Sequence, residues 1–210
     1  IGKTAVWTRK FWWEEMQEGY RTFFSCPHLL RLTILSSTVQ FAVGAAMVLS
    51  IPFIRGELNG QAHEYALFSV AFPIGYVCGM VLLKKLPKSD QTMYVGLIGG
   101  GLSFVLLFFA YSIPLAWICE WFGGLFFPLF NAQSAAIFQR EAPRERLTQL
   151  SAVRLLFLRV TMPLGILFAS YTSLDTRQMY AAAGMMIVLP GLYFLLTSFL
   201  KQDKGLTKMH

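Results

Sequence analysis

Two arginines fall inside a stretch of the sequence that is otherwise almost entirely apolar. The stretch reads SAVRLLFLRVTMPLGILFASY and contains Arg154 and Arg159. Arginine stays charged in proteins, so inside an apolar medium it needs an acidic partner, polar groups or water. Counted from Leu150 along a helix, Arg154 lies about 6 Å and Arg159 about 13 Å into the run. We therefore expect the two cations to have different surroundings.

The shallower cation is close to the end of the run, and the deeper one is not. We expect Arg154 to extend to the surface as an anchor, or to pair with Glu141 or Glu145. Arg159 cannot easily reach the surface, so we predict that it lines a polar cavity. The alternative for Arg159 is a structural ion pair within the helical bundle.

One acidic residue and three amides lie in other apolar runs. Glu120 interrupts the run LAWICEWFGGLFF, and a carboxyl group in a low-dielectric medium can exchange a proton near neutral pH. Glu120 is therefore a candidate for proton coupling, the alternative being an ordinary hydrated carboxylate at the mouth of a vestibule. Gln40, Asn131 and Gln133 are candidates for contact with a small molecule, although amides also bond neighbouring helices.

The composition places these residues in a membrane protein. The chain is 55% hydrophobic and 14% charged, whereas soluble domains carry roughly 25% charged residues. A spanning helix needs about 20 mostly apolar residues. We predict an all-α integral membrane fold with six spans, over residues 29–54, 65–83, 93–111, 115–138, 150–174 and 179–200.

The basic residues alternate between the connecting segments. Of the 18 Lys and Arg residues, fourteen fall before or at the start of the first span (through Arg31), in the second and fourth loops, and in the tail. The other three loops hold only Arg55 and Arg177. This pattern predicts that both termini are cytoplasmic. It also explains the net charge of +7 by the lipid bilayer, without a nucleic-acid partner.

The flanking segments are predicted to lie outside the bilayer. Residues 1–28 form a cytoplasmic linker with an amphipathic helix, on which Trp12, Met16, Tyr20 and Phe23 recur at helical spacing. This helix either lies in the membrane interface or packs on the inner end of the bundle. Residues 201–210 form a cytoplasmic tail.

A short motif occurs twice. Pro73 and Gly75 lie in the second span, and Pro163 and Gly165 lie in the fifth. These are the middle spans of residues 29–111 and 115–200, and they cross the membrane in opposite directions. A 3+3 inverted repeat predicts this relation. Proline and glycine at these positions are candidate gating or hinge residues.

No pattern indicates an enzyme, a cofactor or a metal site. The three cysteines are far apart, and the three histidines have no clustered partner for a triad or for metal ligation. No glycine-rich phosphate loop is present.

Four stretches resemble a known family. They are WWEEMQEGYRTFFSCPHLLRL, EYALFSVAFPIGYVCGMVLL, FNAQSAAIFQREAPRERLTQLSAVRLL and MPLGILFAS. Together they resemble the C-terminal six-helix half of a major facilitator superfamily transporter, and most closely the subgroup of enterobactin-type siderophore exporters and macrolide-efflux permeases. The superfamily's glycine-containing basic loop differs here, because residues 84–91 read KKLPKSDQ.

The resemblance implies half of a proton-coupled exporter in the cell (inner) membrane. Its substrates would be small amphiphilic compounds, such as siderophores or drugs, moved by alternating access. Its partner would be a missing N-terminal six-helix half or a second copy of the chain. The alternative is a non-transporting membrane module, either a truncated half or a partner-binding subunit.

Overall fold

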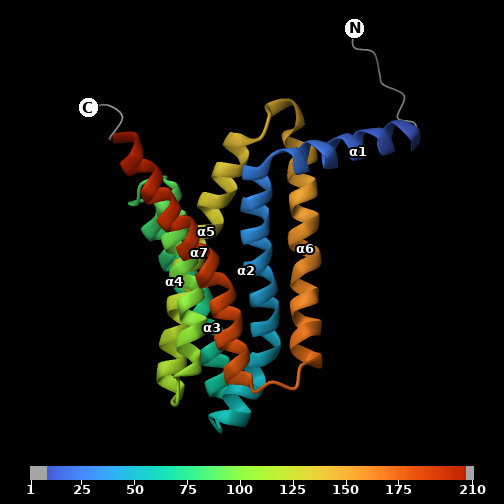
Figure 1. The fold of residues 1–210 in the computed structure, drawn as a ribbon. Helices are drawn as coiled ribbons and strands as arrows, with labels where there is room; N and C mark the ends of the chain where they lie inside the picture. Colours follow the sequence, from blue (N-terminus) through green and yellow to red (C-terminus); the bar gives the residue numbers. More distant parts are fainter. Residues whose placement is uncertain (1–8, 207–210) are drawn as a thin grey trace.

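The computed structural model describes residues 9–206, which form helices and no strand. The elements are α1 (Arg9–Ser25), α2 (Pro27–Ile51), the π-helix η1 (Pro52–Glu57), α3 (Ala62–Leu83), α4 (Asp90–Phe108), α5 (Ile113–Glu141), the 3₁₀-helix η2 (Arg144–Arg146), α6 (Leu147–Tyr171) and α7 (Thr176–Leu206) (Figure 1). Within this range, six helices are long and apolar enough to cross a membrane. The predicted number of six spans is therefore confirmed. Residues 1–8 of the predicted linker and residues 207–210 of the predicted tail lie outside the described residues.

Polar and proline residues set the helix ends, which explains why they differ from the ends of the apolar runs. Pro27 opens α2 at a position where its missing N–H costs nothing. Ser89 caps α4, where its hydroxyl accepts a hydrogen bond of 3.2 Å from Thr92 N–H. The first span extends to Glu57 through η1, three residues beyond the predicted end.

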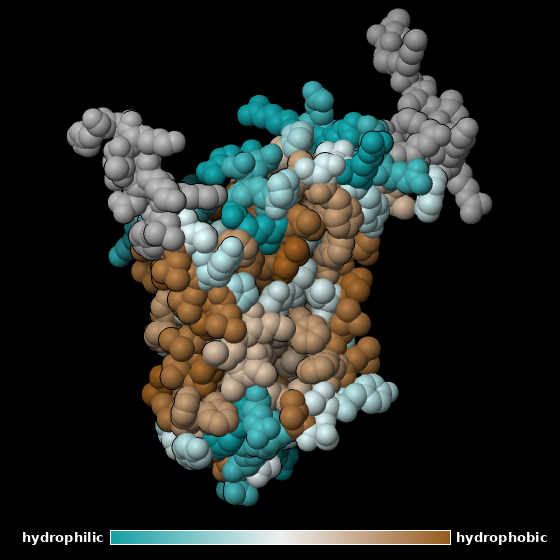
Figure 2. Space-filling model, viewed as in Figure 1, coloured by the Kyte–Doolittle hydropathy of each residue, from teal (hydrophilic) through white to brown (hydrophobic). Residues whose placement is uncertain are grey.

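The outside of the bundle has the polarity of a membrane-spanning protein. Large apolar side chains such as Val77, Leu155 and Leu189 are exposed along the helices. Figure 2 shows hydrophobic residues around the middle of the molecule and hydrophilic residues at both ends. Both ends of the described chain lie at the same end of the bundle (Figure 1).

The helices pack as two interlocked units of three. The middle helix of each unit packs against the first helix of the other, since α3 packs on α5 and α6 packs on α2. The last helices, α4 and α7, pack on each other. This exchange between residues 27–108 and residues 113–206 is the arrangement of a 3+3 inverted repeat.

The repeated Pro-x-Gly motifs sit at equivalent helix contacts. A Cβ atom on Gly75 of α3 would overlap the carbonyl oxygen of Trp121 on α5. A Cβ atom on Gly165 of α6 would overlap the carbonyl oxygen of Phe41 on α2. Both glycines therefore allow backbone-to-backbone contact with the first helix of the other unit.

The first helix of each unit also contributes a glycine to these contacts, at equivalent positions in the two units. A Cβ atom on Gly124 of α5 would overlap the carbonyl oxygen of Phe72, and one on Gly44 of α2 would overlap that of Met162. Each carbonyl belongs to the residue before the motif's proline. Residues of α2 therefore correspond to residues of α5 that are 80 positions later, and residues of α3 correspond to residues of α6 that are 90 positions later.

The predicted amphipathic helix is α1, which leaves the bundle at a steep angle to α2 and α6 (Figure 1). Its C-terminal half packs on the bundle, because Phe23 is buried and its ring stacks on Phe157 of α6 at 5.9 Å between centroids. Trp13 and Met16 are exposed. The predicted apolar face thus contacts the bundle at one end only, and the side chain of Trp12 lies outside the described residues.

Candidate functional site

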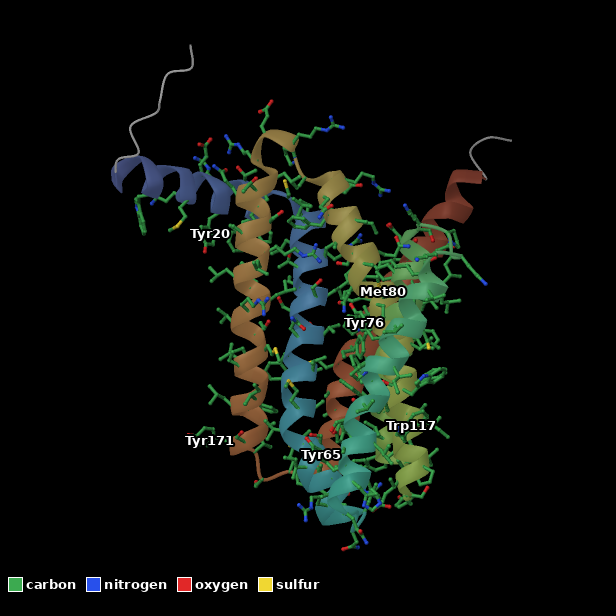
Figure 3. All side chains as sticks on the ribbon, turned by 180° about the vertical axis from the view of Figure 1, so that it is seen from behind. Tyr20, Tyr65, Tyr76, Met80, Trp117 and Tyr171 are labelled. Atoms are coloured by element: carbon green, nitrogen blue, oxygen red, sulfur yellow. The ribbon has the colours of Figure 1, made fainter. Side chains whose placement is uncertain are left out.

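A cavity of about 370 Å³ lies between the two repeat units. Its walls come mainly from α2 and α3, with one residue each from α4, α5 and α7, namely Phe104, Glu120 and Tyr180. Figure 3 shows Tyr65, another wall residue, near the end of the bundle that faces away from both termini. The volume is at the lower end of the roughly 300–1,000 Å³ typical of ligand pockets.

Among the residues that the structure describes, Glu120 is the only charged one that lines this cavity. It is one helical turn before Gly124, and the close approach of Gly124 to Phe72 brings α3 against this part of α5. Glu120 forms no hydrogen bond or ion pair with any residue in the described part of the chain. The cavity therefore contains a carboxyl group without a protein partner.

The hydroxyl groups of the cavity wall do not supply that partner. Ser50 donates to the carbonyl oxygen of Met47 at 2.9 Å, and Ser69 donates to that of Tyr65 at 2.9 Å. The Tyr180 hydroxyl donates to the carbonyl oxygen of Ala46 at 3.3 Å. Each of these donors is used within the backbone of α2 or α3, so it is not directed at Glu120.

The inverted repeat relates this site to Gln40 and Arg159. Gln40 precedes Phe41 as Glu120 precedes Trp121, and Arg159 is 90 positions after Ser69. The exposures correspond as well: Gln40 and Glu120 are both half-buried, and Ser69 and Arg159 are both exposed. Neither Gln40 nor Arg159 lines the Glu120 cavity, so the acid and the deeper arginine do not share it.

The other predicted site residues are spread over the bundle. Asn131 is exposed and Gln133 is buried, both on α5 beyond the cavity. Pro73 lines the cavity and Pro163 is exposed on α6. Gly75 and Gly165 are buried at the helix contacts described above.

The expectation for Arg154 is wrong. Its guanidinium points into the bundle, where it donates to the hydroxyls of Ser36 at 3.0 Å and Ser134 at 2.8 Å. It also lies over the Phe138 ring, 4.7 Å from the centroid. Glu141 pairs instead with Arg140 at the surface. Arg154 therefore connects α2, α5 and α6, because polar partners were available on two neighbouring helices.

A second polar cluster lies around Arg177, for which the sequence predicts only a place in an outer loop. Arg177 Nε lies 2.5 Å from Glu57 Oε2, and the two side chains are only 14% and 21% exposed. Arg177 also donates to the carbonyl oxygens of Phe108 at 3.0 Å and Ala110 at 2.8 Å. The cluster joins η1, the α4–α5 turn and the start of α7. The two loops predicted to share this side carry Arg55 and Arg177 with Glu57, Glu64 and Asp175, so the sequence does not indicate which acid pairs with Arg177.

A second cavity, of about 300 Å³, lies between α2, α6 and α7. It is lined by apolar residues and by Ser37, Thr33, Thr38 and Thr161, with no charged residue. Among the residues that the structure describes, no group of three His, Cys, Asp or Glu could hold a metal ion. The Glu120 cavity is therefore the stronger candidate for a binding site.

The fold is that of a multi-pass membrane protein, consistent with one half of a transporter of the major facilitator superfamily (MFS). The sequence is 23% identical over 196 residues to the uncharacterized MFS-type transporter YvqJ of Bacillus subtilis (strain 168). The match covers 90% of this chain and 46% of the relative, so the chain spans about half the length of that protein. No family model and no solved structure matches the chain.

Proposed function

We propose that the chain forms one six-helix half of a secondary active transporter, a proton-coupled exporter of small amphiphilic compounds such as siderophores or drugs. The observation that carries this proposal is the unpaired Glu120 carboxyl group in a cavity between two inverted repeat units. Substrate and ion sites of such transporters lie near the midplane at the repeat interface. The six membrane-spanning helices and the MFS-type relative support the transporter class.

Transport requires a second wall, which an N-terminal six-helix half or a second copy of the chain would provide. Rocking of the two halves would expose the site alternately to each side. The Pro73–Gly75 and Pro163–Gly165 motifs would act as hinges at the α3–α5 and α6–α2 contacts. Arg159 and Gln40 would form a second, symmetry-related set of substrate contacts, with Asn131 and Gln133 further along the path.

Glu120 would couple this movement to protons. A neutral carboxyl group is tolerated in a closed, dry site, whereas a carboxylate there needs water or a cation. Protonation of Glu120 would therefore favour the closed cavity, and loss of the proton would favour a cavity that is open to water or occupied by a cation. The proton moves and no covalent bond of the substrate changes.

The proposed orientation places both termini in the cytoplasm and the protein in the cell (inner) membrane. Fourteen of the 18 basic residues fall on that side, counting Arg31 at the start of the first span. This asymmetry follows the positive-inside rule.

The test is flux in proteoliposomes that contain the full natural gene product. An imposed pH gradient should drive transport of an amphiphilic dye across the liposome membrane. Addition of substrate should in turn move protons, which a pH-sensitive dye inside the liposomes detects. Glu120→Gln should abolish proton movement, whereas Glu141→Gln, at an exposed acid on the same helix, should not. Arg159→Ala should lower substrate flux.

The outcomes separate the parts of the proposal. Unchanged flux in both Glu120→Gln and Arg159→Ala would show that the site assignment is wrong even if transport occurs. Absence of flux for every compound, in a protein that folds and forms complexes, would favour the non-transporting membrane module.

A further inference from the structure

The Glu120 cavity combines one acidic group with aromatic walls. Beside Glu120, its rings are those of Tyr65, Phe68, Phe72, Phe104 and Tyr180. The rings are held by packing, since Phe104 and Tyr180 form an edge contact at 6.1 Å and Phe68 contacts Phe53 at 6.4 Å. A ligand therefore meets a preformed aromatic surface.

The cavity has no cation of its own. No Lys, Arg or His of the described part of the chain lines it. Arg177, on the same helix as Tyr180, binds Glu57, and Arg154 of α6 binds Ser36 and Ser134, so both cations are already engaged. Arg159 lies on the exposed face of α6. Within the described residues, nothing neutralises a carboxylate at Glu120.

Three of the four hydroxyl donors in the wall are already used. The hydroxyls of Ser50, Ser69 and Tyr180 are bonded to backbone carbonyls, as described above. The Tyr65 hydroxyl has no hydrogen-bond partner among the described residues and remains as one neutral donor. An anionic ligand would still place its charge beside an unpaired carboxylate with no cation to compensate it. A cation would instead gain a counter-ion and the negative faces of several rings, the combination by which proteins recognise quaternary ammonium groups.

We propose that this cavity binds a lipophilic monocation, such as a protonated amine or a quaternary ammonium or phosphonium ion, with Glu120 as its counter-ion. This inference rests on the proposed function and narrows its substrate class from amphiphiles in general to amphiphilic cations. The volume of about 370 Å³ suits one such ion with compact apolar substituents.

Two ions of the same shape and opposite charge test the proposal directly. Binding of tetraphenylphosphonium and of tetraphenylborate is measured on the full natural gene product in nanodiscs of phosphatidylcholine, which carries no net charge. The phosphonium ion should bind saturably and the borate ion should not. Glu120→Gln should weaken phosphonium binding by about tenfold or more, and Glu141→Gln should leave it unchanged.

A second pair of variants tests the aromatic wall. It also tests the proposal independently if Glu120→Gln does not fold. Tyr65→Leu should weaken phosphonium binding several-fold, about the loss expected for one cation–π contact, whereas Tyr65→Phe should retain it. Equal binding of both ions would overturn the proposal. So would phosphonium binding that neither Glu120→Gln nor Tyr65→Leu changes.

Flux measurements on the same protein separate this inference from the proposed function. Transport of neutral or anionic amphiphiles without phosphonium binding would leave the transporter standing and refute the cationic substrate class. Glu120-dependent phosphonium binding without flux of any compound would support the cation site and refute transport.

Discussion

At the scale of single residues, a cation in an apolar helix is accommodated by small polar groups on its neighbours. Arg154 has no acidic partner among the described residues, and its charge is met by two serine hydroxyls, one backbone carbonyl and an aromatic face. A guanidinium suits this role because it is planar, carries five donors and is more weakly hydrated than an ammonium.

The planar shape of Arg154 should matter as much as its charge. We expect Arg154→Lys to lower the free energy of unfolding in detergent by about 1–3 kcal/mol, because lysine cannot bond both serines and stack on Phe138 together. The measurement is reversible unfolding followed by circular dichroism. Arg144→Lys, at an exposed position in η2, is the control and should have no effect. Equal stability of both variants with the parent would show that the contacts of Arg154 add nothing.

The residue types at the site could be read from the sequence, but their partners could not. The scarcity of charge in apolar runs was sufficient to single out Glu120, Arg154 and Arg159. Which neighbours they meet depends on helix rotation and on which helices pack together. Ser36 and Ser134 are 98 positions apart, and nothing in either segment marks them as partners of Arg154.

At the scale of helices, glycines decide which surfaces come together. The α3–α5 and α2–α6 contacts each use a glycine on both helices, so backbone meets backbone without an intervening side chain. Close approach of this kind is how membrane helices gain van der Waals contact where lipid removes the hydrophobic driving force.

A methyl group at either motif glycine should separate its helix pair. We expect Gly75→Ala and Gly165→Ala each to destabilise the protein by about 1–3 kcal/mol, since the added carbon meets a backbone carbonyl that cannot rotate away. Thermal unfolding in detergent measures the effect. Gly56→Ala is the control, because a Cβ atom there has nothing within 4 Å and should change stability by less than about 0.5 kcal/mol. An unaffected Gly75→Ala variant would contradict the contact.

The Arg177–Glu57 cluster should bind three segments at the end of the bundle opposite both termini. We expect Glu57→Gln to cost about 3 kcal/mol of unfolding free energy, because it leaves a mostly buried guanidinium without its counter-charge. A double-mutant cycle with Arg177→Met should give a coupling energy of about 1–3 kcal/mol. The exposed pair of Arg140 and Glu141 is the control, and its cycle should give less than about 1 kcal/mol. A coupling near zero for Arg177 and Glu57 would contradict a structural role.

At the scale of the whole molecule, the sequence predicted the span count and the inverted repeat from hydropathy and from one repeated Pro-x-Gly motif. The motif gives the 90-residue offset between α3 and α6, but not the 80-residue offset between α2 and α5, because corresponding residues such as Gln40 and Glu120 differ in type. The glycine-to-carbonyl contacts show which residues of the two repeat units correspond. The cavity could not be predicted either, because its wall combines residues from five helices whose packing the sequence does not show.

The alternation of basic loops makes the orientation of the whole molecule testable. In a variant whose Cys26, Cys78 and Cys119 are replaced by alanine, we expect Ser112→Cys to react with a membrane-impermeant maleimide on intact cells. Ser112 is exposed in the α4–α5 turn, at the end opposite both termini. Lys88→Cys, exposed between α3 and α4, should react only after permeabilisation, because its loop is one of those that carry the cytoplasmic positive charge. The parent without cysteines is the control for background labelling. Reversed labelling would invert the proposed orientation, and labelling of both positions from one side would contradict a span between them.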